Sequence, residues 1–306
     1  MAVKKKSVPR KRRSTFNSKS RQAPAGRIKR FIKALSASAL TAFSVASCVL
    51  NPQWREGLAL EPILAQLGLP GQGQPAPQPA LAGAQAQTRF AQCPQFFPAG
   101  QPPVVPADQT LRELCFSSFA VLHRGQTKTP VFVAQRLSRQ MLVRAQGIDR
   151  TDRFYPEARL PAAERAELAD YRASGYSRGH MAPAGDMHSL EAMAQSFSLA
   201  NMVPQNQTHN AGAWSRIESD TRKYVMHAAG DVYVFTGPIY NSQPKTIGPG
   251  QVAVPSQIFK VVYDATTKRS WVHWQANSPD AKAKPPISYN EFVRRTGLQL
   301  LPSTKH

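Results

Sequence analysis

The sequence predicts an α+β domain with a mainly antiparallel sheet flanked by helices. Strand-like segments rich in Val and Phe come first, helical segments occupy the middle, and further strand-like segments follow near the C-terminus. Strands and helices that are segregated in this way favour an antiparallel sheet over alternating βαβ units. Hydrophobic residues make up 42% of the 306 residues, which is enough to bury a substantial core.

The strands are expected in two groups. Residues 118–123 and 130–137 are separated by a polar segment and predict an antiparallel pair. The strands of the second group are broken by Gly, Pro, Asp and Thr and cover residues 232–240, 258–264 and 270–276. In the last of these, apolar and polar residues alternate, which suits a sheet with one covered face.

Helices are expected mainly between the two strand groups. Their apolar residues recur at helical spacing over residues 161–173, 190–199 and 211–228. A further short helix is expected near the C-terminus, because Ser288 and Glu291 form a capping box and Gly297 supplies a stop signal after Arg295.

The N-terminus is strongly basic. Of the formal net charge of +21, 13 charges lie in residues 1–33, which contain no acidic residue, so that +8 remains for the rest of the chain. A basic tail of this kind is typical of a targeting or solvated segment. The remaining excess favours a polyanionic partner only weakly.

An uncharged segment follows the tail over residues 34–50. With a positive flank before it, this segment predicts a signal peptide or a membrane anchor that engages the membrane or the export machinery. The expected location is therefore periplasmic, inner-membrane-anchored or secreted. The sequence Val45-Ala46-Ser47-Cys48 also resembles a lipobox, and the acid-free, Arg- and Ser-rich start leaves mitochondrial import as an alternative.

Residues 51–106 are expected to form a linker ahead of a catalytic domain over residues 107–306. A short helix is expected over residues 51–67, after which Gly, Pro, Gln and Ala dominate. If Cys48 is removed or lipidated, Cys93 and Cys115 remain, and an oxidising compartment favours a disulfide between them over two buried thiols.

Two polar clusters carry the chemistry. The first is Ser177-Arg178-Gly179-His180, and the second lies about 20 residues later, beyond one expected helix. Within the second cluster, Glu218 and Arg222 are one helical turn apart and therefore neighbours. The members of the second cluster are Asn201, Gln205, Asn210, Trp214, Glu218 and Arg222.

These residue types suit phosphodiester hydrolysis, which needs an activated water and a sink for negative charge. A histidine can accept a proton near neutral pH. Oxygen ligands favour a hard cation such as magnesium, and arginines bind phosphate oxygens.

Taken together, the two clusters resemble the DNA/RNA non-specific endonucleases, which are secreted bacterial and mitochondrial nucleases with a ββα-metal fold. The family hallmark is Asp-Arg-Gly-His, and Ser177 stands here in place of its Asp. The later family pattern of Asn, Gln, Asn, Trp, Glu and Arg is met in full. The resemblance covers residues 93–302, and its multi-part spacing makes it specific.

The resemblance implies a role for each matching residue. His180 is the general base, and Asn210 is the direct ligand to Mg²⁺, with Mn²⁺ as a substitute. Glu218 holds the water shell of the metal ion. Arg178 and Arg222 stabilise the phosphate and the leaving oxygen, and the implied substrates are DNA and RNA.

Four points stay open in the sequence. The family has an upstream arginine that contacts nucleic acid, and either Arg150 or Arg153 fits it. Asn201 and Gln205 are candidates for nucleic-acid contact, with structural hydrogen bonding as the alternative. A homodimer is compatible with the sequence, and so is a membrane-tethered nucleic-acid-binding protein that keeps the fold but not turnover. The presence of both His180 and Asn210 favours the enzyme.

Overall fold

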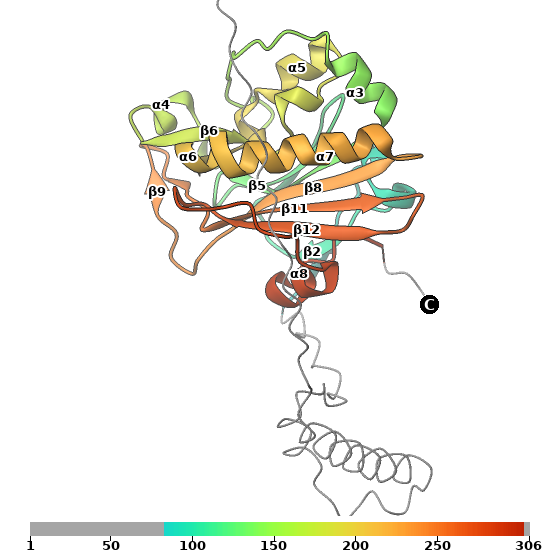
Figure 1. Ribbon diagram of the computed structural model, residues 1–306. Coiled ribbons are helices and arrows are strands. Elements are labelled where there is room, and N and C mark those ends of the chain that lie inside the picture. Colours follow the sequence, from blue (N-terminus) through green and yellow to red (C-terminus); the bar gives the residue numbers. More distant parts are fainter. Residues whose placement is uncertain (1–82, 303–306) are drawn as a thin grey trace, which may run out of the picture. The chain divides into compact units, whose positions relative to one another are not determined.

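The computed structural model describes residues 83–302 (Figure 1). The basic tail, the signal peptide or anchor, the lipobox and the helix predicted over residues 51–67 lie outside this range. Within residues 83–302, no helix is both long enough and apolar enough to cross a membrane.

A six-stranded sheet forms the centre of the domain, in the order β12-β11-β8-β5-β4-β3. Every neighbouring pair in it is antiparallel. The strands are β3 (Leu111–Cys115), β4 (Ala120–Arg124), β5 (Thr129–Leu137), β8 (Val232–Ile239), β11 (Gln257–Asp264) and β12 (Ser270–Ala276). The two predicted strand groups meet where β5 pairs with β8, and the predicted α+β class is confirmed.

Shorter strands form two-stranded ribbons outside this sheet. They are β1 (Gln85–Gln87) with β2 (Val104–Pro106), β6 (Tyr176–His180) with β7 (Met202–Asn206), and β9 (Thr246–Ile247) with β10 (Val252–Ala253). The helices are α3 (Arg139–Ala145), α4 (Leu168–Tyr171), α5 (Leu190–Ser196), α6 (Gln207–His209), α7 (Ser215–His227) and α8 (Tyr289–Thr296).

Most of the predicted helices are present. The C-terminal helix begins after the N-cap Ser288 and ends at Gly297, whose φ of 69° is the left-handed conformation that glycine adopts at low cost. The continuous helix predicted over residues 161–173 is wrong. Only one 3₁₀ turn and α4 form there. Glu167 is the N-cap of α4, and Asp170 binds the backbone N–H groups of Glu167 and of Gly250.

Both faces of the central sheet are covered. Alternate residues of β5 and β11 face opposite ways, so that Val133 and Ile258 pack under α7 while Phe132 and Phe259 pack on the other side. Figure 1 shows α7 lying across one face and α8 on the opposite side. The prediction of one covered face for β12 is wrong, since Val272 and Gln275, which face opposite ways, are both buried.

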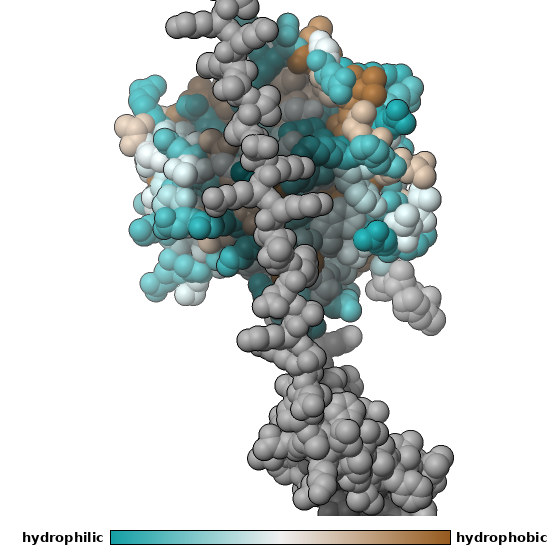
Figure 2. Space-filling model, in the orientation of Figure 1, coloured by the Kyte–Doolittle hydropathy of each residue, from teal (hydrophilic) through white to brown (hydrophobic). Residues whose placement is uncertain are grey.

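The surface seen in Figure 2 is largely hydrophilic, and the hydrophobic residues in this view gather near α3. Val143 in α3 and Leu190 in α5 are 50% and 71% exposed. Single exposed apolar residues of this kind are common on soluble domains.

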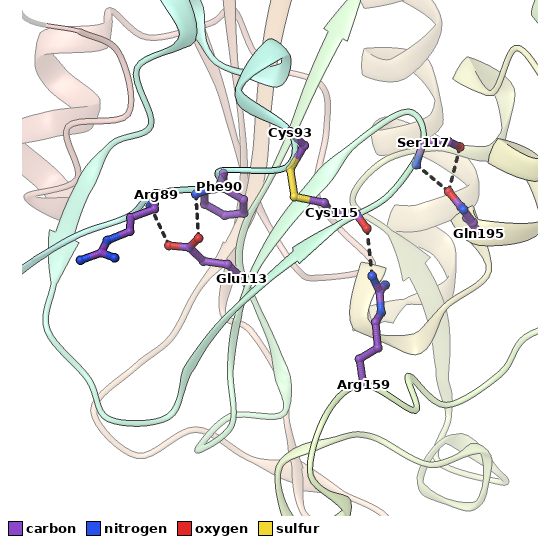
Figure 3. The surroundings of a disulfide bond; sticks show 8 residues. All are labelled: Arg89, Phe90, Cys93, Glu113, Cys115, Ser117, Arg159 and Gln195. Carbon is purple, nitrogen blue, oxygen red and sulfur yellow. Dashed lines mark hydrogen bonds between the residues drawn. A yellow bond between two sulfur atoms is a disulfide. The ribbon is translucent and has the colours of Figure 1, made fainter.

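A disulfide joins Cys93 to Cys115, as the sequence predicts (Figure 3). Close to it, the carboxylate of Glu113 accepts hydrogen bonds from the backbone N–H groups of Arg89 and Phe90 at 2.8 and 2.7 Å. Phe90 and Phe97 are buried against the sheet. Residues 83–106, which fall within the predicted linker, therefore pack as part of the folded domain.

We expect Cys93→Ser/Cys115→Ser to lower the free energy of unfolding by about 3 kcal/mol. This free energy corresponds to the conformational entropy that closing a loop of this length removes from the unfolded chain. Urea unfolding of the oxidised protein and the double variant measures the difference. Reduced wild-type protein is the control and should match the variant. A loss below about 0.5 kcal/mol would show that apolar packing and Glu113 alone hold this segment.

Candidate active site

The ribbon of β6 and β7 presents the Arg-Gly-His motif. Arg178, Gly179 and His180 pair with Pro204, Val203 and Met202. A Cβ atom at Gly179 would overlap the side chain of Gln205. The glycine of the motif is therefore required by the close approach of the two strands, which places His180 at the end of the ribbon.

Asn201 fixes the chain directly after His180. Its amide oxygen accepts from Ala182 N at 2.8 Å, and its nitrogen donates to the carbonyl oxygens of Ala182 and Ser196 at 2.9 and 2.8 Å. Gln205 lies against His209, with 3.2 Å between Nε2 and Nδ1. Both Asn201 and Gln205 are completely buried, so their prediction as nucleic-acid contacts is corrected to a structural role.

His180 lies between two aromatic rings. Its ring centroid is 5.0 Å from that of Phe197, edge-on, and 5.9 Å from that of Phe154. Burial lowers the pKa of His180 to about 3, and the positive charge of Arg150 acts in the same direction. The imidazole is therefore neutral at physiological pH.

Two arginines stack on the rings of Phe154 and Phe197. The guanidinium of Arg178 lies 4.7 Å from the centroid of Phe154, and that of Arg150 lies 5.0 Å from the centroid of Phe197. Arg153 is exposed and makes no such contact with either ring. The geometry thus brings Arg150, rather than Arg153, to the histidine.

Asn210 begins a π-helical turn (Asn210–Trp214) that leads directly into α7. Such turns are rare and often lie at functional sites, because the wider turn redirects side chains relative to the regular helix. The sequence predicts the helix here but not the π turn. Glu218 follows in the first turn of α7, where burial raises the pKa of its carboxyl to about 7 against the opposing charge of Lys260.

Asn210 and Glu218 suit a hard divalent cation. Among the described residues, the side-chain amide of Asn210 makes no hydrogen bond, and Glu218 forms no ion pair. Amide and carboxylate oxygens are the donors that Mg²⁺ or Mn²⁺ favours. No cluster of three His, Cys, Asp or Glu side chains with metal-binding geometry occurs within residues 83–302.

Four residues of this region are missing from the sequence-based prediction. Phe154 and Phe197 support the histidine and the arginines, while Asp186 and Lys260 lie buried near Glu218 and Arg222. Lys260 leaves a signal in the sequence, since a lone lysine stands in the apolar strand Ile258–Val262. The other three carry no local signal, because their roles depend on contacts between distant segments.

Comparison with known proteins identifies the family. A model of the DNA/RNA non-specific endonucleases matches residues 101–301. The chain belongs to this family. Its fold is that of the ββα-metal nucleases, and a chain of the crystal structure of the EndoG/EndoGI complex is similar, with a TM-score of 0.57 and 25% identity over 69% of this chain and 91% of that one.

Curated relatives of this nuclease family member include mitochondrial proteins. The mitochondrial nuclease EXOG of Danio rerio is 42% identical over 154 residues, which are 46% of this chain and 44% of the relative. Mitochondrial Nuclease 1 of Schizosaccharomyces pombe is 35% identical over 181 residues, or 55% and 54% of the two chains. The chain thus spans about half the length of these relatives.

Proposed function

We propose that the protein is a sequence-non-specific endonuclease that hydrolyses phosphodiester bonds in DNA and RNA with a magnesium ion. One observation carries this proposal: a buried, neutral histidine lies beside two arginines that share its aromatic support. Family membership supports the reaction class. Contacts through arginine, metal and phosphate carry no base information, which accounts for the lack of sequence preference.

His180 takes the proton of the attacking water in this mechanism. Among residues 83–302, its buried Nε2 has no hydrogen-bond partner. Arg178 and Arg222 donate hydrogen bonds to phosphate oxygens and stabilise the charge that develops on them. Asn210 would hold the divalent ion directly and Glu218 through water. When bound, the ion neutralises phosphate charge and stabilises the departing oxygen.

Digestion of supercoiled plasmid and of RNA by the full-length protein tests the proposal. With magnesium, both substrates should be degraded, and the plasmid should pass through an open-circular form, which only internal cuts produce. EDTA should stop both reactions. Tight, salt-sensitive binding without cleavage under magnesium or manganese would favour instead a nucleic-acid-binding protein with the nuclease fold.

We expect the affinity of the free protein for Mn²⁺ to rise with pH up to about 7 and then to level off. Burial raises the pKa of Glu218 to about 7, so below that pH the carboxyl keeps a proton that ion binding must displace. His180, with a pKa of about 3, does not titrate in this range. Calorimetry between pH 5.5 and 8.5 measures the profile.

Glu218→Gln should flatten this profile, because the amide does not titrate. The exposed Glu191→Gln is the matched control and should leave the profile unchanged. A wild-type affinity that is constant from pH 5.5 to 8.5 would contradict the role of Glu218.

We expect Arg150→Ala to raise KM for plasmid by about tenfold, because the variant loses one charge-assisted hydrogen bond to a phosphate. The guanidinium of Arg150 stacks on Phe197, whereas that of Arg153 does not. Arg153→Ala removes the same charge three residues away and should change KM less than threefold. Equal effects of the two variants in steady-state kinetics would show that net charge, not position, matters.

We further propose that the N-terminal segment takes the domain into an oxidising compartment by export. The disulfide supports such a compartment. Mitochondrial import is the alternative that the names of the relatives favour. A fusion of residues 1–87 to alkaline phosphatase, which is active only after export from a bacterial cytoplasm, should be active. An inactive fusion would argue for import.

A further inference from the structure

Arg222 does not form an ion pair with Glu218, its acidic neighbour on α7. Glu218 lies one turn earlier on α7, and acidic and basic residues at this spacing usually attract each other. Instead, Nη1 of Arg222 binds Oδ1 of Asp186 at 3.1 Å, and no ion pair joins Arg222 to Glu218 within residues 83–302. Asp186 therefore determines where this guanidinium lies.

Asp186 is buried and held in place by the residues around it. It lies six residues after His180, ends the 3₁₀ turn Ala184–Asp186 and is only 4% exposed. Its Oδ2 accepts a hydrogen bond from Nε2 of Gln135 in β5 at 3.5 Å. Because a buried carboxylate is costly unless it is paired, Asp186 holds Arg222 firmly.

The neighbouring glycine allows the close approach. A Cβ atom at Gly185 would lie 3.2 Å from Nη1 of Arg222, so the backbone of this turn packs directly against the guanidinium. The segment that carries His180 is thereby tied to the helix that carries Glu218.

Lys260 completes a buried charge cluster. Its side chain is 1% exposed, donates to Oγ1 of Thr236 at 2.8 Å and lies 5.4 Å from the ring centroid of Trp214. The cluster thus contains two carboxylates, Asp186 and Glu218, and two cations, Arg222 and Lys260. Within this cluster, only Asp186 and Arg222 are within ion-pair distance of each other, and Glu218 forms no ion pair among residues 83–302.

We propose that Asp186 is a positioning residue that draws Arg222 away from Glu218, so that Glu218 stays free to hold the water shell of a divalent cation. This inference rests on the proposed function. Without the carboxylate of Asp186, Arg222 turns to Glu218, and its guanidinium then competes with the cation for that carboxylate. Asp186 thus keeps the phosphate-binding arginine and the metal-binding carboxylate apart.

Calorimetric titration of the full-length protein with Mn²⁺, without nucleic acid, tests this arrangement. Asp186→Asn should weaken Mn²⁺ binding by about tenfold, because one charged competitor reaches Glu218. Arg222→Gln should bind Mn²⁺ at least as tightly as the wild type. The double variant should match Arg222→Gln, since the competitor is absent.

The controls separate this mechanism from a general loss of charge or stability. Asp231→Asn removes a carboxylate from an exposed pair with Arg136 and should leave binding unchanged. Thermal unfolding checks each variant, and the smaller Asp186→Ser replaces Asp186→Asn if that variant does not fold. The proposal would be overturned if Asp186→Asn bound Mn²⁺ as tightly as the wild type. It would also be overturned if Asp186→Asn weakened Mn²⁺ binding as much in the Arg222→Gln protein as in the wild type.

Asn210→Ala distinguishes this proposal from the assignment of the metal ligand. In one outcome, Asn210→Ala leaves Mn²⁺ binding unchanged, while Asp186→Asn still weakens it and does so only when Arg222 is present. Asn210 is then not the metal ligand, but the role of Asp186 stands. If Mn²⁺ binding depends on Asn210 but not on Asp186, Asn210 stands as the metal ligand and the role of Asp186 is refuted.

Discussion

Replacement of His180 by alanine is expected to lower kcat for plasmid cleavage by about 1000-fold, within the range that a general base contributes. The imidazole is neutral because burial holds its pKa at about 3, and alanine offers no proton acceptor in its place. KM should stay within about threefold of the wild type, because Arg150 and Arg178 keep their own aromatic supports. Steady-state kinetics with magnesium measures both constants.

His227→Ala is the matched control, since His227 is exposed at the end of α7. It should leave kcat unchanged. Circular dichroism should show that the His180 variant keeps its fold, because its neighbours Phe154 and Phe197 also contact each other, with ring centroids 4.9 Å apart. A folded His180→Ala protein with more than a tenth of the wild-type kcat would rule out His180 as the base.

Replacement of Asn210 by alanine should reduce cleavage at 1 mM magnesium by about 100-fold or more, because the direct ligand to the ion is lost. The amide of Asn210 has no other task that would explain such a loss, since it makes no hydrogen bond among the described residues. Raising the magnesium concentration should restore part of the activity, because the proposed contact of Glu218 with the water shell of the ion would remain.

Asn241→Ala, which truncates an exposed asparagine outside the site, is the control and should behave as the wild type. Half-activation by magnesium is the decisive readout, since a ligand defect raises the concentration required, whereas partial unfolding lowers kcat at every concentration. An unchanged half-activation concentration would show that Asn210 is not the ligand.

Features that repeat locally could be predicted from the sequence. The strands near residues 130–137, 232–240 and 258–264 are visible because side chains of buried strands are apolar over a short run. The C-terminal helix is visible because Ser288 and Gly297 mark its ends. The motif Arg178-Gly179-His180 was found by its spacing from the residues on α7, and spacing is a property of the chain itself.

The helix over residues 161–173 and the assignments of Asn201 and Gln205 show where local patterns fail. Apolar spacing gave no sign that Asp170 would bind the backbone of Gly250, 80 residues away. Likewise, Asn201 and Gln205 are polar, yet both are completely buried. Asp170 and Asn201 bind backbone groups 80 and 19 residues away, whereas Gln205 contacts His209 only four residues away. Apolar spacing records neither these contacts nor the burial of the two amides.

The sequence by itself predicted the fold class, the disulfide and, through the family resemblance, the histidine, the asparagine and the acidic and basic residues of the proposed site. Only the tertiary structure decided that Arg150 rather than Arg153 lies near His180, that Arg222 binds Asp186 rather than Glu218, and that Lys260 is buried near both carboxyl groups. The physical reason is that desolvation and pairing set the state of a charged side chain. Both depend on which distant segments pack around it, and spacing along the chain does not record that packing.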